Sequence, residues 1–265
     1  MITFPNIKIN LGLYITGKRS DSYHDLLSCF YPVNWSDILE ITPSEIFEFI
    51  QTGILIPGSV KDNLCVKAYD LIKEKHSIGS VRIHLHKIIP MGAGLGGGSS
   101  DAAFTLKILN AIFNLGLDHS QLQQYASQIG SDCAFFIENK TAIATSRGEV
   151  LEKYELDLKG KHIVIVCPDI HVSTKQAFYA INPKPYSADF KQLLADKNKW
   201  KGNLHNQFED TILPIHPELE IIKHLLYENG AFYASMSGSG SAMFGLFDKE
   251  PDFNLNGLFG FKGIL

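Results

Sequence analysis

The chain has 265 residues, of which 45% are hydrophobic and 20% are charged, a composition typical of globular proteins and not of disordered or fibrous ones. Its formal net charge is −4, and without a long basic run it lacks a broad surface for a nucleic-acid backbone or an anionic membrane. No apolar run reaches the about 18 residues of a membrane span, and the first residues lack the features of a signal peptide. The four cysteines lie far apart with no C-x-x-C pair, which is typical of reduced thiols. We therefore expect a soluble, cytoplasmic protein.

Residues 5–15 predict the first strand. Isoleucine and leucine occupy every second position from Ile7 to Leu13, so one face of this strand is apolar. Lys8 and Asn10 fall on the opposite face. An isolated lysine in such a position is ordinarily a plain surface residue.

The next segments place polar residues at the ends of regular elements. Residues 19–35 begin with turn formers and become apolar, which puts Tyr23 and His24 where a loop enters a strand or a short helix. Farther along, Asp62 or Asn63 can cap a helix.

A glycine-rich loop is the strongest signal in the sequence. Residues 80–88, SVRIHLHKI, alternate between apolar and polar side chains, as in an antiparallel strand with one wet face. PMGAGLGGGSSDAA follows at 90–103, and a helix is expected to begin near Ser99 to Asp101 and to end at Gly116. Glycine lets successive amides converge on an oxyanion, and a helix N-terminus adds unpaired N–H groups. The pattern predicts a phosphate site at Gly92, Gly94, Gly96, Gly97 and Gly98.

The same glycines leave another interpretation open. Gly92, Gly94 and Gly97 match the G-x-G-x-x-G pattern of dinucleotide-binding proteins, although a single match is weak. A Walker phosphate loop is excluded, because Ser99 follows Gly98 where that pattern needs lysine. A flexible linker is disfavoured, because the glycines lie between a strand and a capped helix.

Two later segments hold polar residues between apolar ones. Asp132, in GSDCAFF, could either cap a helix or act in catalysis, and the segment alone does not decide between these roles. SGSGSA at residues 237–242 favours a tight turn over a ligand site.

The charged stretch at residues 152–161 precedes a new apolar strand, HIVIVCP, and we place a domain boundary there. The two expected domains are residues 1–155 and 156–265. Because strands and helices do not strictly alternate, both halves are expected to be α+β. Helices are expected in the second half near residues 174–181, 187–196 and 217–229.

Taken in order, these segments resemble the GHMP kinases, a family of small-molecule kinases. The similarity covers nearly the whole chain, through PNIKINLGLYI, SDSYHDLLSCF, DNL, PMGAGLGGGSSDAA, GSDCAFF, VSTKQAF and MSGSGSAMF. Within the family, Tyr23 and His24 in their D-x-Y-H context resemble the kinases that act on 4-diphosphocytidyl-2-C-methyl-D-erythritol in the non-mevalonate isoprenoid pathway. The resemblance implies transfer of phosphate from ATP, with Mg²⁺, to the 2-hydroxyl group of that small molecule.

The resemblance also implies an architecture. The GHMP kinase fold combines an N-terminal, ATP-binding domain like the second domain of ribosomal protein S5 with a ferredoxin-like C-terminal domain. We expect no nucleic-acid or membrane partner, and a monomer or weak homodimer. Two other functions compete with this one: a dinucleotide-dependent oxidoreductase, and a nucleic-acid module that shares the ribosomal-protein-like domain.

By the same resemblance, Lys8 and Asp132 form the catalytic pair. Phosphoryl transfer needs in-line positioning, charge neutralisation and a group that receives the hydroxyl proton. Asp132 can accept this proton, and Lys8 can keep Asp132 ionised. The ATP phosphates are assigned to Pro90, Gly92, Gly94, Gly96, Gly97, Gly98, Ser99 and Ser100. Ser100 is also the candidate for placing Mg²⁺ through the phosphates.

On the substrate side the resemblance implies that Tyr23 and Phe178 sandwich the cytosine and that His24 hydrogen-bonds its edge. Asn10 and Thr174 are further substrate contacts, and Asn63 contacts nucleotide or substrate. The adenine-binding residues stay unassigned.

Two positions depart from the family pattern. Ser22 stands where glycine usually precedes the Tyr-His pair, and Ala134 stands where proline commonly occurs.

Overall fold

The computed structural model describes residues 1–21, 23–173, 177–178, 181–255 and 257–265. Ser22, which departs from the family pattern, and Thr174, a predicted substrate contact, lie outside the described residues. The chain forms two compact units that do not follow chain order. The first unit comprises Met1–Ile7, Trp35–Met91 and Gly96–Lys140, and the second comprises Lys8–Asn34, Gly92–Leu95 and Thr141–Leu265. The predicted boundary between residues 155 and 156 concerns domains in chain order and stays a prediction.

The first unit is built on a four-stranded sheet with the order β1-β4-β6-β5. Strand β6 runs antiparallel to β4 and parallel to β5. As the sequence predicts, apolar residues of β6 face the core and polar ones face outward: Ile83 and Leu85 are fully buried, while Arg82 is exposed. The strands are β1 (Ile2–Thr3), β4 (Ile38–Pro43), β5 (Glu48–Gly53) and β6 (Val81–Lys87).

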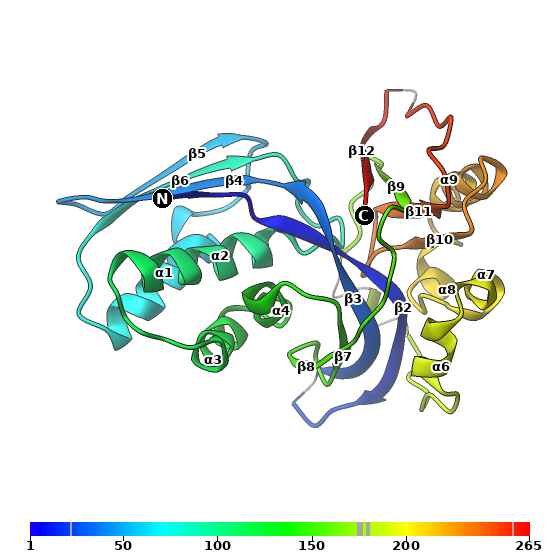
Figure 1. Ribbon diagram of the computed structural model, residues 1–265, viewed down its shortest axis with the longest axis horizontal. Helices are drawn as coiled ribbons and strands as arrows, with labels where there is room; N and C mark the ends of the chain where they lie inside the picture. Colours follow the sequence, from blue (N-terminus) through cyan, green and yellow to red (C-terminus); the bar gives the residue numbers. More distant parts are fainter. Residues whose placement is uncertain (22, 174–176, 179–180, 256) are drawn as a thin grey trace. The chain divides into compact units, whose positions relative to one another are not determined.

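Helices cover one face of this sheet, and Figure 1 shows α1 and α2 lying along it. Helix α1 (Leu64–Lys75) begins at Asn63, whose side chain accepts a hydrogen bond from the Cys65 N–H group, so the predicted cap is confirmed. Helix α2 begins two residues before the expected Ser99, because Gly96 adopts a left-handed conformation and starts the helix at once. The other helices of this unit are η1 (Val60–Asp62), α2 (Gly97–Ile112), α3 (His119–Ile129) and α4 (Cys133–Glu138).

The second unit contains most of one sheet, of order β2-β3-β7-β8, and all of another, of order β10-β11-β9-β12. In the latter sheet every neighbouring pair is antiparallel. Its central strand β9 is the apolar segment that the sequence predicts. The strands are β2 (Asn6–Lys18), β3 (His24–Ser36), β7 (Ala142–Thr145), β8 (Val150–Lys153), β9 (His162–Cys167), β10 (Tyr233–Met236), β11 (Met243–Phe247) and β12 (Phe259–Ile264).

Short helices complete the second unit. The longest that is described, α9, has Pro217 in its first turn and packs on β10 and β11. Of the helix predicted at residues 174–181, residues 177, 178 and 181 are described; the first two are helical and the third is not. The described helices are α6 (Phe190–Ala195), η2 (Lys197–Lys199), α7 (Trp200–Asn203), α8 (Glu209–Ile212) and α9 (Pro217–Glu228).

Both faces of the first half of β2 are buried, which corrects one expectation. Lys8 is 2% exposed and Asn10 is 1% exposed, so the surface position expected for Lys8 is wrong. The four cysteines are buried free thiols, as expected. Among the described residues, no helix has both the length and the apolar character needed to cross a membrane.

Candidate active site

The glycine-rich loop leads directly into the N-terminus of α2, where an anion can bind. Gly92, Gly94 and Gly96 have φ angles of 67°, 77° and 73°, a region that favours glycine. The helix then begins at Gly97, and Pro90 lies in the irregular segment that precedes the loop. The first N–H groups of a helix have no intrahelical partner, so this turn offers a cradle for phosphate oxygens.

The two serines of the first turn differ in exposure. Ser99 is half-buried, whereas Ser100 is 0% exposed, and its Oγ makes no hydrogen bond to any described residue. The Ser99 hydroxyl hydrogen-bonds the thiol of Cys133, and burial raises the pKa of that thiol to about 12. Cys133 therefore stays neutral at physiological pH. Ser99 and Ser100 supply the side-chain hydroxyl groups of this turn.

Asp132 immediately precedes Cys133 and α4, a helix that packs against α2. The residue after Asp132, Cys133, contacts Ser99 in the first turn of α2, so this segment lies near the start of α2. Within the part of the chain that is described, the side chain of Asp132 makes no capping hydrogen bond to α4. The structure thus disfavours the capping role, although the catalytic role stays a prediction.

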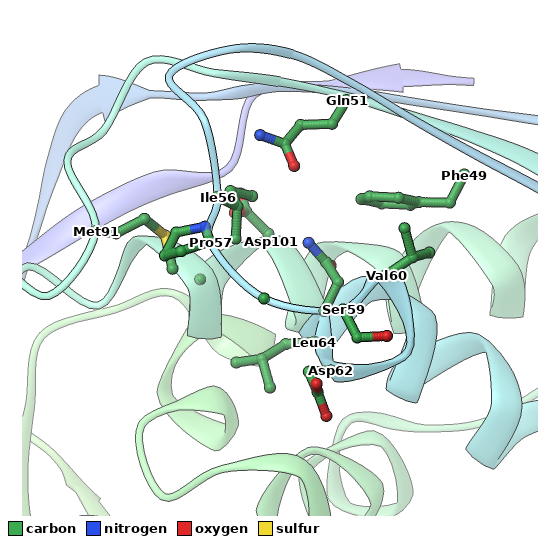
Figure 2. A pocket seen from close by; sticks show the side chains of 13 residues that line it. Phe49, Gln51, Ile56, Pro57, Ser59, Val60, Asp62, Leu64, Met91 and Asp101 are labelled. Atoms are coloured by element: carbon green, nitrogen blue, oxygen red, sulfur yellow. The ribbon is translucent and has the colours of Figure 1, made fainter.

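A cavity of about 160 Å³ lies in the first unit next to the start of α2. Figure 2 shows Phe49 and Gln51 above it, and Val60 and Leu64 below it. The cavity is lined by Phe49, Gln51, Ile56, Pro57, Gly58, Ser59, Val60, Asp62, Asn63, Leu64, Met91, Gly98 and Asp101. Its apolar walls and few polar groups suit a planar heterocyclic ring. Of its lining residues, the sequence analysis assigned a binding role only to Asn63 and Gly98, because the walls come from segments that are separate in the chain.

Asp101 contributes an unusual acceptor to this cavity. It is 2% exposed, and its Oδ1 has no hydrogen-bond partner among the described residues. Its Oδ2 lies 2.8 Å from the ammonium group of Lys87, which also pairs with Asp37. The sequence does not predict this buried group, because an aspartate near the start of a helix is common for electrostatic reasons alone.

In the second unit, the buried ammonium group of Lys8 has polar partners. It donates to Asn10 Oδ1 at 2.6 Å and to the carbonyl oxygen of Gly94 at 3.2 Å. Asn10 is oriented in turn, because its Nδ2 donates to Ser28 Oγ at 2.9 Å. These contacts hold the ammonium group beside the glycine-rich loop.

Residues 237–241, which we call the Ser-Gly loop, pack against the same part of the glycine-rich loop. Ser237 Oγ donates to the carbonyl oxygen of Gly94 at 3.0 Å, and the N–H of Ala242 donates to the carbonyl oxygen of Ala93 at 3.1 Å. The sequence favoured a simple turn here, and the turn is present. Its contact with a segment more than 140 residues earlier could not be predicted.

The predicted base-binding residues also lie in the second unit. His24 stacks on Phe178 with ring centroids 5.3 Å apart, and Phe208 meets the Phe178 ring edge-on at 4.8 Å. Tyr23 is exposed, with the Arg147 guanidinium over its ring at 5.1 Å. The structure thus brings His24 and Phe178 together, and it adds Phe208, which no sequence motif indicated.

The predicted catalytic pair is divided between the units: Lys8 belongs to the second and Asp132 to the first. Their pairing stays a prediction. The dinucleotide interpretation loses support, because the two neighbours of β6 in its sheet, β4 and β5, both precede it in the chain, whereas that fingerprint requires a parallel strand after the helix that follows the glycines.

Comparisons with known proteins identify the family of this chain. The model of the GHMP kinases N terminal domain matches residues 63–140, and that of GHMP kinases C terminal matches residues 190–254. The chain is 49% identical to the 4-diphosphocytidyl-2-C-methyl-D-erythritol kinase of Bacteroides thetaiotaomicron, with 100% of both chains covered. It is 47% identical to the enzyme of that name from Cytophaga hutchinsonii, over 95% of this chain and 94% of the relative.

Solved structures show the same relationship. A 4-(cytidine 5'-diphospho)-2C-methyl-D-erythritol kinase matches with a TM-score of 0.77 and 33% identity, over 93% of this chain and 90% of the other. The mevalonate kinase of Methanococcus jannaschii matches with a TM-score of 0.70, over 99% of this chain and 97% of the other. At 15% identity this second match shows the fold alone. The expected α+β fold is thereby confirmed, and the chain belongs to the GHMP kinases.

Proposed function

We propose that this chain transfers the γ-phosphoryl group of ATP to the 2-hydroxyl group of 4-diphosphocytidyl-2-C-methyl-D-erythritol, a step of the non-mevalonate isoprenoid pathway. One observation carries the proposal: identities of 47% and 49%, over 95% and 100% of the chain, to relatives named as kinases of this alcohol. We also propose a cytoplasmic location and a monomer or weak homodimer.

We assign the nucleotide to the first unit. The N–H groups at the start of α2 hold the phosphates, and the cavity beside Gly98 takes the adenine. The side-chain amide of Asn63 can donate to a ring nitrogen of adenine, and the unpartnered Oδ1 of Asp101 can accept from its amino group. Phe49 and Leu64 supply apolar walls for the ring faces.

The first turn of α2 also fits Mg²⁺. This ion prefers oxygen ligands and is commonly bound together with substrate phosphates. The Ser100 Oγ is buried without a partner among the described residues, and Ser99 lies next to it. We assign the ion to these hydroxyl groups and the ATP phosphates; when bound, it would neutralise charge on the transferred group.

The remaining chemistry falls to two charged side chains. Asp132 accepts the proton of the attacking hydroxyl group, because an alcohol is a poor nucleophile while it is protonated. Lys8, oriented by Asn10, neutralises negative charge that develops on the phosphoryl oxygens.

We assign the cytosine to the aromatic side chains of Tyr23, His24 and Phe178. Because His24 stacks on Phe178, we infer that its ring shifts to the edge of the base when the base stacks on Phe178. Phe208 supports Phe178 from its edge.

A coupled assay of ADP release tests the proposed function. The purified chain is incubated with ATP, Mg²⁺ and, in turn, 4-diphosphocytidyl-2-C-methyl-D-erythritol, homoserine, mevalonate and galactose. Turnover of the first alcohol alone, with the new phosphate located on its 2-oxygen by ³¹P NMR, is the expected result. Turnover of another alcohol in its place would contradict the proposal.

A further inference from the structure

Residues 205–207 of the second unit are attached to strand β2. The backbone N–H of Leu13 donates to the carbonyl oxygen of His205, and the N–H of Gln207 donates to the carbonyl oxygen of Leu13, both at 2.8 Å. These hydrogen bonds form an isolated parallel bridge between Leu13 and Asn206. Position 206 is therefore held by the strand that carries the ammonium group of the site.

The side chain of Asn206 reaches from this bridge to the Ser-Gly loop. It is 0% exposed, and its Nδ2 donates to the carbonyl oxygens of Met236 at 2.7 Å and Gly238 at 2.9 Å. Its Oδ1 accepts a hydrogen bond from the Phe208 N–H group at 3.0 Å. The two carbonyl groups flank Ser237, so one amide group fixes the backbone on both sides of that residue.

Ser237 in turn contacts the glycine-rich loop at Gly94. Its Oγ donates to the Gly94 carbonyl oxygen at 3.0 Å, and Lys8 Nζ donates to the same oxygen at 3.2 Å. A Cβ atom on Gly94 would lie only 1.9 Å from the Ser237 carbonyl oxygen, so the two backbones touch. The Gly94 carbonyl group therefore has one contact with the Ser-Gly loop and one with the proposed catalytic lysine.

We propose that Asn206 is a positioning residue for phosphoryl transfer, which acts through Ser237 on the Gly94 carbonyl group that Lys8 contacts. This inference rests on the proposed kinase function. Glu209 supplies a second anchor, because its Oε1 accepts a hydrogen bond from the Met236 N–H group at 2.7 Å. Loss of the Asn206 amide therefore loosens the loop without releasing strand β10.

The test compares Asn206→Ala and Ser237→Ala with a matched control, Asn110→Ala. Asn110 donates to the Leu117 carbonyl oxygen at 2.9 Å and accepts from the Leu117 N–H group at 3.0 Å. It anchors a loop in the same way, but near the end of α2, the opposite end from the glycine-rich loop. Steady-state kinetics with ATP and the alcohol are measured for each variant, with the melting temperature in parallel.

A displacement of reacting groups by about 1 Å costs on the order of 10²-fold in rate. We expect kcat of Asn206→Ala and Ser237→Ala to fall by that order with little change in either KM, and Asn110→Ala to keep the wild-type kcat. Because Asn206 acts through the contact of Ser237 with Gly94, the kcat of the double variant should be no lower than that of the slower single variant.

A folded Asn206→Ala variant with wild-type kcat would overturn the inference. If this variant does not fold, Ser237→Ala decides, because it leaves the Asn206 anchor in place: a reduced kcat supports the inference and a wild-type kcat overturns it. The wild-type chain is assayed first, since an inactive wild-type chain would contradict the proposed function itself.

Discussion

The ammonium group of Lys87 lies 2.8 Å from Asp101 Oδ2 and also pairs with Asp37, and all three side chains are buried. One cation thus faces two carboxyl groups, and a buried excess of negative charge is unfavourable. Burial raises the pKa of Asp101 to about 7, although the charge of Lys87 acts in the opposite direction. Protonation of Asp101 makes the cluster neutral.

This raised pKa predicts a pH-dependent stability. Between the ordinary aspartate pKa of about 3.9 and about 7, the folded state binds more protons at Asp101 than the unfolded state. The contribution of Asp101 to the free energy of unfolding therefore falls as the pH rises through this range and stays constant above it. Asp101→Asn resembles the protonated carboxyl group, so urea unfolding at pH 5 and pH 8 should show a smaller decrease for the variant. An equal decrease in the free energy of unfolding of both proteins would show that another group causes the pH dependence.

Replacement of Asp132 tests the proposed base. Asp132→Asn keeps the shape and removes the proton acceptor, so kcat should fall by about 10²- to 10⁴-fold while both substrates still bind. Asparagine caps a helix about as well as aspartate, so a purely capping residue would tolerate the change. Steady-state kinetics, binding and melting are measured together. A wild-type kcat would remove Asp132 from the mechanism.

Asn63 combines a structural and a proposed binding role, and one substitution separates them. In Asn63→Asp the side chain still caps α1, because its Oδ1 can accept from the Cys65 N–H group. It loses the side-chain amide donor that we propose for adenine. KM for ATP should rise and the melting temperature should stay near its wild-type value. If KM for ATP is unchanged, the adenine lies elsewhere.

The aromatic residues that we propose for cytosine predict a change in the KM for the alcohol substrate and not in the KM for ATP. Each aromatic contact with a base contributes about 1 to 3 kcal/mol, so Phe178→Ala should raise KM for the cytidine substrate by about 5- to 150-fold. Tyr23→Ala should act in the same direction. KM for ATP is the internal control, and a rise in that constant alone would assign Phe178 to the nucleotide.

Gly94 and Gly116 form a matched pair for the contact between the loops. Both have positive φ, 77° and 68°, but only a Cβ on Gly94 would collide, at 1.9 Å from the Ser237 carbonyl oxygen. Gly116→Ala should cost only the left-handed strain, about 1 to 2 kcal/mol, and keep kcat. Gly94→Ala should lower kcat as well, because Ser237 must move. Equal kcat values for the two variants would show that the contact does not matter for the reaction.

Local sequence determined the conformation of the glycine-rich loop and the start of α2. A run of glycines permits left-handed backbone at Gly92, Gly94 and Gly96, and helix initiation depends on neighbouring residues alone, so both features are visible within a dozen positions. The cap at Asn63 could be predicted for the same reason. Resemblance to a family then supplied roles for residues whose local patterns were ambiguous, such as Asp132.

Only the tertiary structure decided which polar groups are buried. The alternation in β2 predicted a polar face for Lys8. The Lys8 side chain is nevertheless buried, because the Gly94 carbonyl oxygen and Asn10 Oδ1 accept hydrogen bonds from its ammonium group. Asn206 is a more extreme case: its amide binds carbonyl groups 30 and 32 residues later in the chain. A hydrogen bond over such a separation leaves no periodic pattern, because it is set by the packing of whole elements and not by the conformation of neighbouring residues.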